Sequence, residues 1–243
     1  MLTISRASNA LFLDFDGTLV EFADQPESVF IPAYLPDLLN HLHEELDGAL
    51  ALISGRSIAS LDSLLDLPHI PLAGGHGAEW RIDGNYQIDE RHSPDFSVAA
   101  ELLIDFAHRH NLLFENKGHS VALHFRQHPE MKKNIDHFIS SHIETLPGLR
   151  VIYGNCVREI QSKGMDKGKA VARFMQVVPF AGRSPVYIGD DTTDEDAFQW
   201  VNANYGASCK VGEGMTSAQY RFENVAEVRR YLANLFAKNE GAS

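Results

Sequence analysis

The sequence predicts an α/β protein built on a parallel sheet, with a separate α+β unit inserted into it. Three observations predict this fold. Short continuous apolar runs alternate with helical stripes in the first and last thirds of the chain, as is typical of parallel strands buried on both faces. The middle third instead groups short strands around two helices. Because the last third returns to the first pattern, we expect the parallel-sheet unit to be discontinuous.

The first third contains three expected strands and two expected helices. The strands are apolar runs too short for helices, at residues 10–14, 49–53 and 70–73. The helices carry leucines and isoleucines at three- and four-residue spacing, at residues 34–46 and 58–65. These elements alternate along the chain, which favours parallel pairing of the strands.

The middle third predicts the inserted α+β unit. Its expected elements are a hairpin at 80–88, helices at 95–110 and 130–143, and strands at 121–125, 150–153 and 157–160. Two helices packed on an antiparallel sheet form such a unit. We place its boundaries near residues 79 and 162, with a hinge at Ser162-Lys163-Gly164. The expected domains are therefore 1–78 with 163–243, and 79–162.

The last third completes the parallel sheet. Helical patterns are expected at 168–176, 197–204 and 225–236, and strands at 185–189 and 208–211. The first of these strands is closed by Asp190-Asp191. Acidic residues thus follow a strand in both halves of the divided unit.

Composition excludes several classes of protein. The 243 residues carry a formal net charge of −12, which argues against a nucleic-acid partner because such proteins need a basic face. No apolar run approaches the roughly 18 residues of a membrane span, and the start lacks the apolar region of a signal peptide. The two cysteines, Cys156 and Cys209, are expected to be reduced. We expect a cytoplasmic protein with a small-molecule substrate and, since no apolar heptad is present, a monomer.

Two aspartates follow the first strand directly. Asp14 and Asp16 lie where the carboxyl ends of parallel strands bind ligands. They are two residues apart, so in extended chain their side chains point the same way and need a cation between them. A solvated Asp-Gly turn is the simpler alternative. An EF-hand loop is excluded because the later acids are missing.

Polar residues also end the second strand. Ser54-Gly55-Arg56 offers a hydroxyl and a backbone N–H that can hold a phosphoryl oxygen. The alternative is a helix N-cap at Ser54 or Ser57.

Two further segments lie after the inserted unit. Lys167 opens a helix, where the macrodipole disfavours a cation unless an anionic centre is near. The segment 189–195 combines acids and hydroxyls at a strand end. Helix capping alone is the alternative, but the segment has more acids and hydroxyls than a cap needs.

These four segments, in this order, resemble the motifs of the haloacid dehalogenase superfamily. Further segments resemble bacterial trehalose-6-phosphate phosphatases over nearly the whole chain: 52–56, 71–79, 115–118, 124–126, 159–160 and 166–169. The resemblance implies a Rossmann-like core with an inserted cap, and magnesium-dependent hydrolysis of trehalose 6-phosphate, the last step of trehalose biosynthesis.

The resemblance implies roles for the core residues. Asp14 would be the nucleophile that forms an aspartyl phosphate, and Asp16 the general acid and base. Asp14, Asp190 and the backbone carbonyl of Asp16 would hold Mg²⁺. Lys167 would offset charge on the phosphoryl group. The resemblance also implies further core positions, which would orient groups around the metal or bind phosphate and substrate. They are Asp191, Asp194, Ser54, Gly55 and Arg56.

The resemblance also assigns sugar recognition to the inserted unit. Glu115, Lys117 and Glu159 match the family's set that reads glucose hydroxyls, and charged hydrogen-bond partners suit a disaccharide. Arg126 is a weaker candidate in the same unit, as is His124. His76, in a Gly-His-Gly turn, either contacts substrate or only satisfies that turn.

Three other functions remain open from the sequence. The first is a phosphatase for another sugar phosphate, of the sucrose or mannosylglycerate type; Glu115, Lys117 and Glu159 favour trehalose phosphate. The second is a non-catalytic sugar-phosphate sensor, against which the intact aspartates argue. The third is a phosphomutase, which would have to keep water from the aspartyl phosphate.

Overall fold

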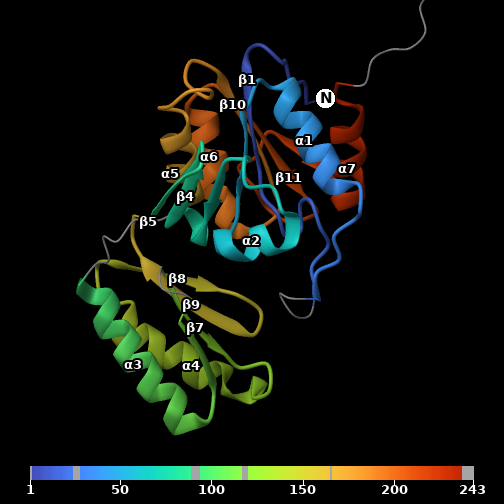
Figure 1. Cartoon of the computed structure of the whole chain (residues 1–243). Coiled ribbons are helices and arrows are strands. Elements are labelled where there is room, and N and C mark those ends of the chain that lie inside the picture. Colours follow the sequence, from blue (N-terminus) through green and yellow to red (C-terminus); the bar gives the residue numbers. More distant parts are fainter. Residues whose placement is uncertain (1, 24–27, 89–93, 117–119, 165, 237–243) are drawn as a thin grey trace, which may run out of the picture. The chain divides into compact units, whose positions relative to one another are not determined.

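The computed structural model describes residues 2–23, 28–88, 94–116, 120–164 and 166–236 (Figure 1). The chain forms two compact units. One combines residues 1–87 with 166–243, and the other comprises residues 88–165. The larger unit is therefore discontinuous, as the sequence predicts.

The larger unit contains an eight-stranded sheet. Its strands, in spatial order, are β12 (Tyr220–Phe222), β11 (Ala207–Val211), β10 (Ser184–Gly189), β1 (Asn9–Leu13), β2 (Leu50–Ile53), β3 (Leu72–Gly74), β4 (Glu79–Ile82) and β5 (Asn85–Ile88). The pairs from β12 to β3 are all parallel. The parallel sheet predicted from the continuous apolar runs is confirmed, and β1, β2 and β10 are buried almost throughout.

Helices cover both faces of this sheet. They are α1 (Leu35–Glu45), α2 (Ile58–Leu65), α5 (Lys167–Phe174), α6 (Glu195–Ala203) and α7 (Val225–Asn234). Figure 1 shows α1 and α7 on one side of the sheet and α5 and α6 on the other. Three of the helices begin at a side-chain cap, from Ser57, Asp166 or Asn224, which satisfies a backbone N–H left open in the first turn.

The smaller unit is an antiparallel sheet with two helices. The spatial order is β6 (Leu113–Asn116), β7 (Ser120–His124), β9 (Val157–Ser162) and β8 (Leu149–Tyr153). Helix α3 spans Pro94–His110, and α4 spans Lys132–Phe138 and continues as a π-helix over Ile139–Ile143. Apolar residues of both helices form one buried cluster with alternate residues of the strands. The α+β character expected for the middle third is confirmed.

The structure moves the first boundary of the inserted unit. The expected hairpin exists, but β4 pairs antiparallel with β3 and so extends the large sheet. Ile82 belongs to the large hydrophobic core, and Trp80 packs against it. The boundary lies near residue 87, later than the expected 79, because one apolar face of this hairpin is buried in the larger unit.

Two strands are not predicted by the sequence. In β6 no residue is fully buried, and in β12 only Phe222 is. Both are edge strands, so neither needs the apolar pattern that marks the other strands. Both cysteines are free. Among the helices that the structure describes, none has the length and apolar character that a bilayer crossing requires.

Candidate active site

Three aspartates meet at the carboxyl edge of the large sheet. Asp14 follows β1 and Asp190 follows β10, and these strands are parallel neighbours. Asp194 lies in the 3₁₀ turn before α6. One carboxylate oxygen from each of the three lies within 4.8 Å of the others. Parallel pairing therefore brings together two acidic segments that are far apart in sequence.

Lys167 neutralises part of this cluster. Its Nζ donates to Asp14 Oδ1 and to Asp194 Oδ1, each at 2.7 Å, and its side chain is buried. Burial alone would lower the pKa of Lys167, but the two carboxylates outweigh burial and raise it above its ordinary value. The anionic centre that would justify a lysine at a helix start is therefore present.

Asp194 is fully committed to protein groups. Its Oδ1 also accepts from the Tyr187 hydroxyl at 2.6 Å. Its Oδ2 accepts from the backbone N–H groups of Asp190 at 3.0 Å and Asp191 at 2.8 Å. Asp191 in turn caps the 3₁₀ turn in a capping box with Asp194. Asp194 thus holds both Lys167 and the acidic loop in position. These bonds leave neither of its oxygens with a lone pair directed at a ligand.

The remaining oxygens of the cluster suit a divalent cation. Asp14 Oδ2 and Asp190 Oδ1 are buried and have no hydrogen-bond partner among the described residues. Burial raises the pKa of Asp14 well above its ordinary value, and burial together with Asp194 raises that of Asp190 to about 7. A cation bound between two such carboxylates would stabilise their ionised forms, as in a metal site. An all-oxygen donor set fits Mg²⁺.

Gly17 and Gly189 allow this close packing. Gly17 has φ +79°, and a Cβ there would lie 2.3 Å from Asp190 Oδ2. A Cβ on Gly189 would lie 2.4 Å from Asp194 Cγ. Neither position has space for a side chain while the carboxylates keep their places.

Gly17→Ala is expected to displace Asp190 and to lower turnover at this site at least about 100-fold, since misplacing a reacting group by about 1 Å has that effect. It should also destabilise the fold by about 1–2 kcal/mol through its left-handed backbone. Gly182→Ala is the matched control, because Gly182 has φ +81° and a Cβ there would meet no atom within 4 Å. Melting curves and steady-state kinetics measure the two effects. Equal activity in the two variants would contradict the steric argument.

Asp16 is held by Arg56 on the same edge of the sheet. The guanidinium forms two bonds to the carboxylate, Nε to Oδ2 at 2.6 Å and Nη2 to Oδ1 at 2.7 Å. Ser54 is buried at the end of β2, and its Oγ accepts from the backbone N–H of Arg56 at 3.1 Å. The helix N-cap is Ser57, whose Oγ accepts from Ser60. The capping alternative therefore applies to Ser57, and Ser54 lies in the strand-end loop.

His76 lies beside this loop. Its backbone has φ +56°, and its N–H donates to the Ser54 carbonyl at 2.9 Å. The imidazole packs over Gly55, where a Cβ would meet its Cε1 at 2.7 Å. The turn interpretation of His76 describes its backbone, while its side chain lies against the Ser-Gly-Arg segment.

Two residues of the site were missed by sequence reasoning. Tyr187 lies within an apolar strand and resembles a core aromatic, although its hydroxyl reaches Asp194. Lys210, in β11, is buried, and its Nζ donates to the backbone carbonyl of Asp190. Lys210 could have been found from the sequence, because it is a polar residue near the carboxyl end of a parallel strand.

The smaller unit places two of its candidates on one face. Glu115 pairs with Ala122, and Ala122 with Glu159, across β6, β7 and β9. Side chains of directly opposed residues share a face, here the face opposite α3 and α4. Glu159 is buried and accepts from Ser120 Oγ at 2.6 Å, whereas the half-exposed Glu115 carboxylate lies 2.8 Å from His124 Nε2.

Two other candidates of this unit are placed differently. Arg126 follows β7 and is exposed. Lys117 lies outside the described residues.

The geometry of the larger unit defines a class of protein. An aspartate pair follows the central strand, a serine follows its neighbour, and a lysine bridges to a second acidic loop. The fold that carries them is of the haloacid-dehalogenase type. A phosphatase of this superfamily from Bacteroides thetaiotaomicron has the same fold, with a TM-score of 0.66 at 15% identity, covering 95% of each chain.

Sequence comparison then gives the family. The chain belongs to the trehalose-phosphatase family, whose model matches residues 12–227. The trehalose-6-phosphate phosphatase of Escherichia coli (strain K12) is 41% identical over 229 residues, covering 93% of this chain and 86% of the relative. The C-terminal domain of the Candida albicans trehalose-6-phosphate phosphatase shares the fold, with a TM-score of 0.81 at 19% identity over 96% of this chain and 97% of that one. This protein is therefore a phosphatase.

Proposed function

We propose that the protein hydrolyses trehalose 6-phosphate to trehalose and inorganic phosphate, with Mg²⁺, through an aspartyl phosphate on Asp14. The observation that carries this proposal is the asymmetry of the Asp14 carboxylate. Its Oδ1 is held by Lys167, whereas Oδ2 is buried without a partner among the described residues. Lys167 thus holds one side of the carboxylate, and the carboxylate keeps an oxygen open to the metal and the phosphoryl group.

Asp14 acts as the nucleophile in this mechanism. One oxygen of its carboxylate forms a bond to phosphorus while the bond from phosphorus to the sugar oxygen breaks, and water later cleaves the acyl phosphate at phosphorus. Splitting the displacement into two steps lowers each barrier. Lys167 offsets the negative charge that develops on the transferring group, from a position already fixed by Asp194.

Asp16 moves the proton. It gives a proton to the leaving sugar oxygen and afterwards takes one from the attacking water. Two hydrogen bonds from Arg56 hold this carboxylate in place. The Ser54 hydroxyl and the adjacent backbone N–H of Gly55 would support phosphoryl oxygens.

Mg²⁺ would be held by Asp14, Asp190 and the backbone carbonyl of Asp16. When bound, it neutralises charge shared by the nucleophile and the phosphate. Asp194 and Lys210 position the loop of Asp190 by bonding the N–H and the carbonyl of that residue, and Asp191 caps the adjoining turn.

The inserted unit supplies substrate specificity in this proposal. Glu115 and Glu159 share one sheet face and would accept hydrogen bonds from sugar hydroxyls. Lys117 and Arg126 would contribute from the same unit, and His76 from the larger one. A cytoplasmic, monomeric enzyme is part of the proposal; cell fractionation and light scattering test these two points.

A substrate panel tests the function. Phosphate release from trehalose 6-phosphate should exceed that from sucrose 6-phosphate and glucose 6-phosphate. Chelation should abolish it, magnesium should restore it, and calcium should inhibit because its larger, more flexible shell misplaces the nucleophile. Full activity after exhaustive chelation would contradict the metal assignment, and preference for another sugar phosphate would contradict the substrate assignment.

Glu159→Gln is expected to lower kcat/KM for trehalose 6-phosphate by about 10–150-fold, since a charged hydrogen bond to a hydroxyl contributes roughly 1.5–3 kcal/mol. Turnover of p-nitrophenyl phosphate, which lacks the sugar, should stay within about twofold. Glutamine can still accept from Ser120, so the sheet should survive. Glu130→Gln, at an exposed position of the same unit, is the control. An equal loss on both substrates would place Glu159 in the chemistry of phosphoryl transfer.

A further inference from the structure

Glu79 is a buried carboxylate of the larger unit that the proposed mechanism does not use. It is the first residue of β4. The backbone N–H of Ile58 donates to its Oε1 at 2.7 Å, and the Tyr86 hydroxyl donates to its Oε2 at 2.5 Å. Burial and this carboxylate raise the pKa of Tyr86 to about 12, so the hydroxyl keeps the proton that it donates. A buried carboxylate is costly unless it is hydrogen-bonded, and we therefore expect these two bonds to fix its orientation.

The bond to Ile58 attaches β4 to the loop that follows β2. Ile58 is the first residue of α2, directly after the loop of residues 54–57. The side chain of Ser57 caps this helix by accepting from Ser60, which leaves the N–H of Ile58 to another acceptor. Glu79 is that acceptor, and the positive end of the helix dipole favours its charge.

The turn after β3 holds the same loop through backbone bonds. The N–H of Gly75 donates to the Arg56 carbonyl, and the N–H of His76 donates to the Ser54 carbonyl, each at 2.9 Å. Among the described residues, the N–H of Gly55 has no hydrogen-bond partner. The carbonyls of the loop are thus occupied, whereas this N–H is left for a ligand.

Gly74 provides the space in which the carboxylate meets the loop. A Cβ on Gly74 would lie 2.6 Å from Glu79 Oε1, 2.8 Å from the Arg56 carbonyl oxygen and 2.8 Å from the Ile58 nitrogen. The backbone of Gly74 is extended, with φ −103°, so other residues could adopt it. The glycine is therefore required by the contact between Glu79 and the loop.

We propose that Glu79 is a positioning residue for phosphate binding, whose carboxylate fixes the end of the loop and so keeps the Ser54 hydroxyl and the Gly55 N–H directed at the phosphoryl group. This role rests on the proposed function, in which those two groups support phosphoryl oxygens. Glu79 acts through the loop and does not touch the substrate.

Inhibition by inorganic phosphate tests the proposal, with the full-length protein, Mg²⁺ and p-nitrophenyl phosphate as substrate. Glu79→Leu removes both hydrogen bonds. It is expected to raise the inhibition constant of phosphate and the KM at least about 10-fold, since a misdirected donor to a charged group costs about that factor. In Glu79→Gln the amide can accept from Ile58 and donate to Tyr86, so both constants should stay within about threefold of the parental values.

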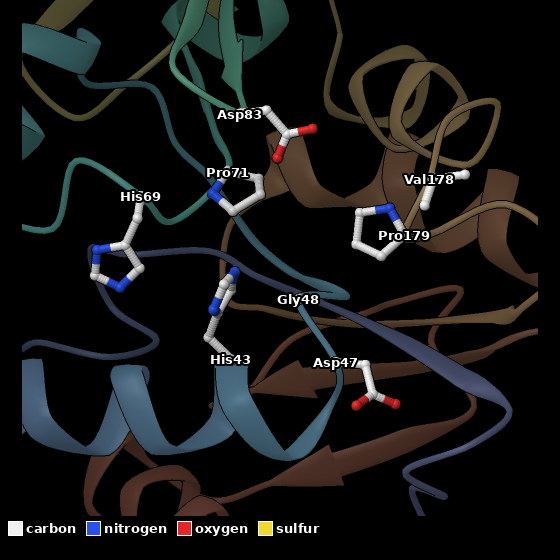
Figure 2. Close-up of a pocket in the computed structure, with 8 residues that line it drawn as sticks. All are labelled: His43, Asp47, Gly48, His69, Pro71, Asp83, Val178 and Pro179. Carbon is white, nitrogen blue, oxygen red and sulfur yellow. The ribbon is translucent and has the colours of Figure 1, made fainter.

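Two aspartates near the same elements supply controls. Asp62, in α2, bonds to Arg81 of β4 at 2.7 Å, so Asp62→Asn weakens the contact between the same two elements without altering the loop. Asp83 lies in the turn at the other end of β4. Figure 2 shows it at a pocket that is also lined by Pro71, the residue before β3, and hence at the opposite edge of the sheet. Asp62→Asn and Asp83→Asn should both bind phosphate as the parent does, although Asp62→Asn should have a lower Tm.

The inhibition constant separates positioning from a purely structural role. A structural role would lower the Tm and the active fraction of Glu79→Leu but not its affinity for phosphate, so a parental inhibition constant would overturn the proposal. An equal loss in Glu79→Gln would also overturn it, because glutamine retains both bonds.

Tyr86→Phe covers the case in which Glu79→Leu does not fold, because Tyr86 is half-exposed. Loss of its single bond to Glu79 should raise the inhibition constant about threefold, and a parental value would contradict the proposal. Because neither phosphate nor p-nitrophenyl phosphate contains a sugar, a failure of the parent on trehalose 6-phosphate would contradict the proposed substrate and leave this comparison valid.

Discussion

Asp14→Asn is expected to lower kcat for trehalose 6-phosphate by at least about 10⁴-fold while the fold survives. Asparagine keeps the shape of the side chain and can still accept from Lys167, but it cannot form an acyl phosphate. Burial holds the pKa of Asp14 well above its ordinary value, so its ionised form is costly to the folded state. The neutral variant should therefore have a Tm equal to or above that of the parent in metal-free buffer.

The control for this variant is Asp37→Asn, an acid in the first turn of α1, which should retain parental kinetics. Mass spectrometry after the assay excludes deamidation back to aspartate. Residual turnover near the parental rate, with the asparagine intact, would show that another group attacks phosphorus.

The sequence predicts which residues gather at the carboxyl edge of the large sheet, because each of them belongs to a local pattern. Asp14, Ser54 and Asp190 each follow a strand that is apolar and continuous. Parallel pairing of such strands brings their carboxyl ends to one edge. Lys167 was identified from its conflict with the helix dipole, and the structure shows the carboxylates that resolve the conflict.

Other parts of the site depend on tertiary contacts that no local pattern encodes. Tyr187 is indistinguishable from a core aromatic until its hydroxyl is placed against Asp194. The pairing of Arg56 with Asp16 was likewise not expected, because the two residues belong to different strand ends. The local sequence predicts the hairpin of β4 and β5. Which sheet the hairpin joins depends on the packing of Ile82 and Trp80 in the large core.

Lys167→Met is expected to have the opposite effect on stability from Asp14→Asn, and a comparable effect on catalysis. Methionine retains the volume of the stem, but Asp14 and Asp194 lose the ammonium that bonds both at 2.7 Å. Removing one partner from a buried ion pair costs roughly 3–5 kcal/mol, because the remaining charge stays buried. Turnover of trehalose 6-phosphate and of p-nitrophenyl phosphate should fall by similar factors, since the lysine acts at the phosphoryl group. Lys169→Met, on the exposed face of the same helix, is the matched control.

The double variant Asp14→Asn/Lys167→Met separates charge from packing. If the loss of stability in Lys167→Met comes from uncompensated carboxylates, it should be smaller by about 1–3 kcal/mol when Asp14 is already neutral. Asp194 remains buried, with the Tyr187 hydroxyl and two backbone N–H groups as donors, so part of the loss should persist. Urea unfolding of the four proteins measures the coupling. Strictly additive losses would mean that Lys167 supports the fold through its stem, and that its charge acts only during turnover.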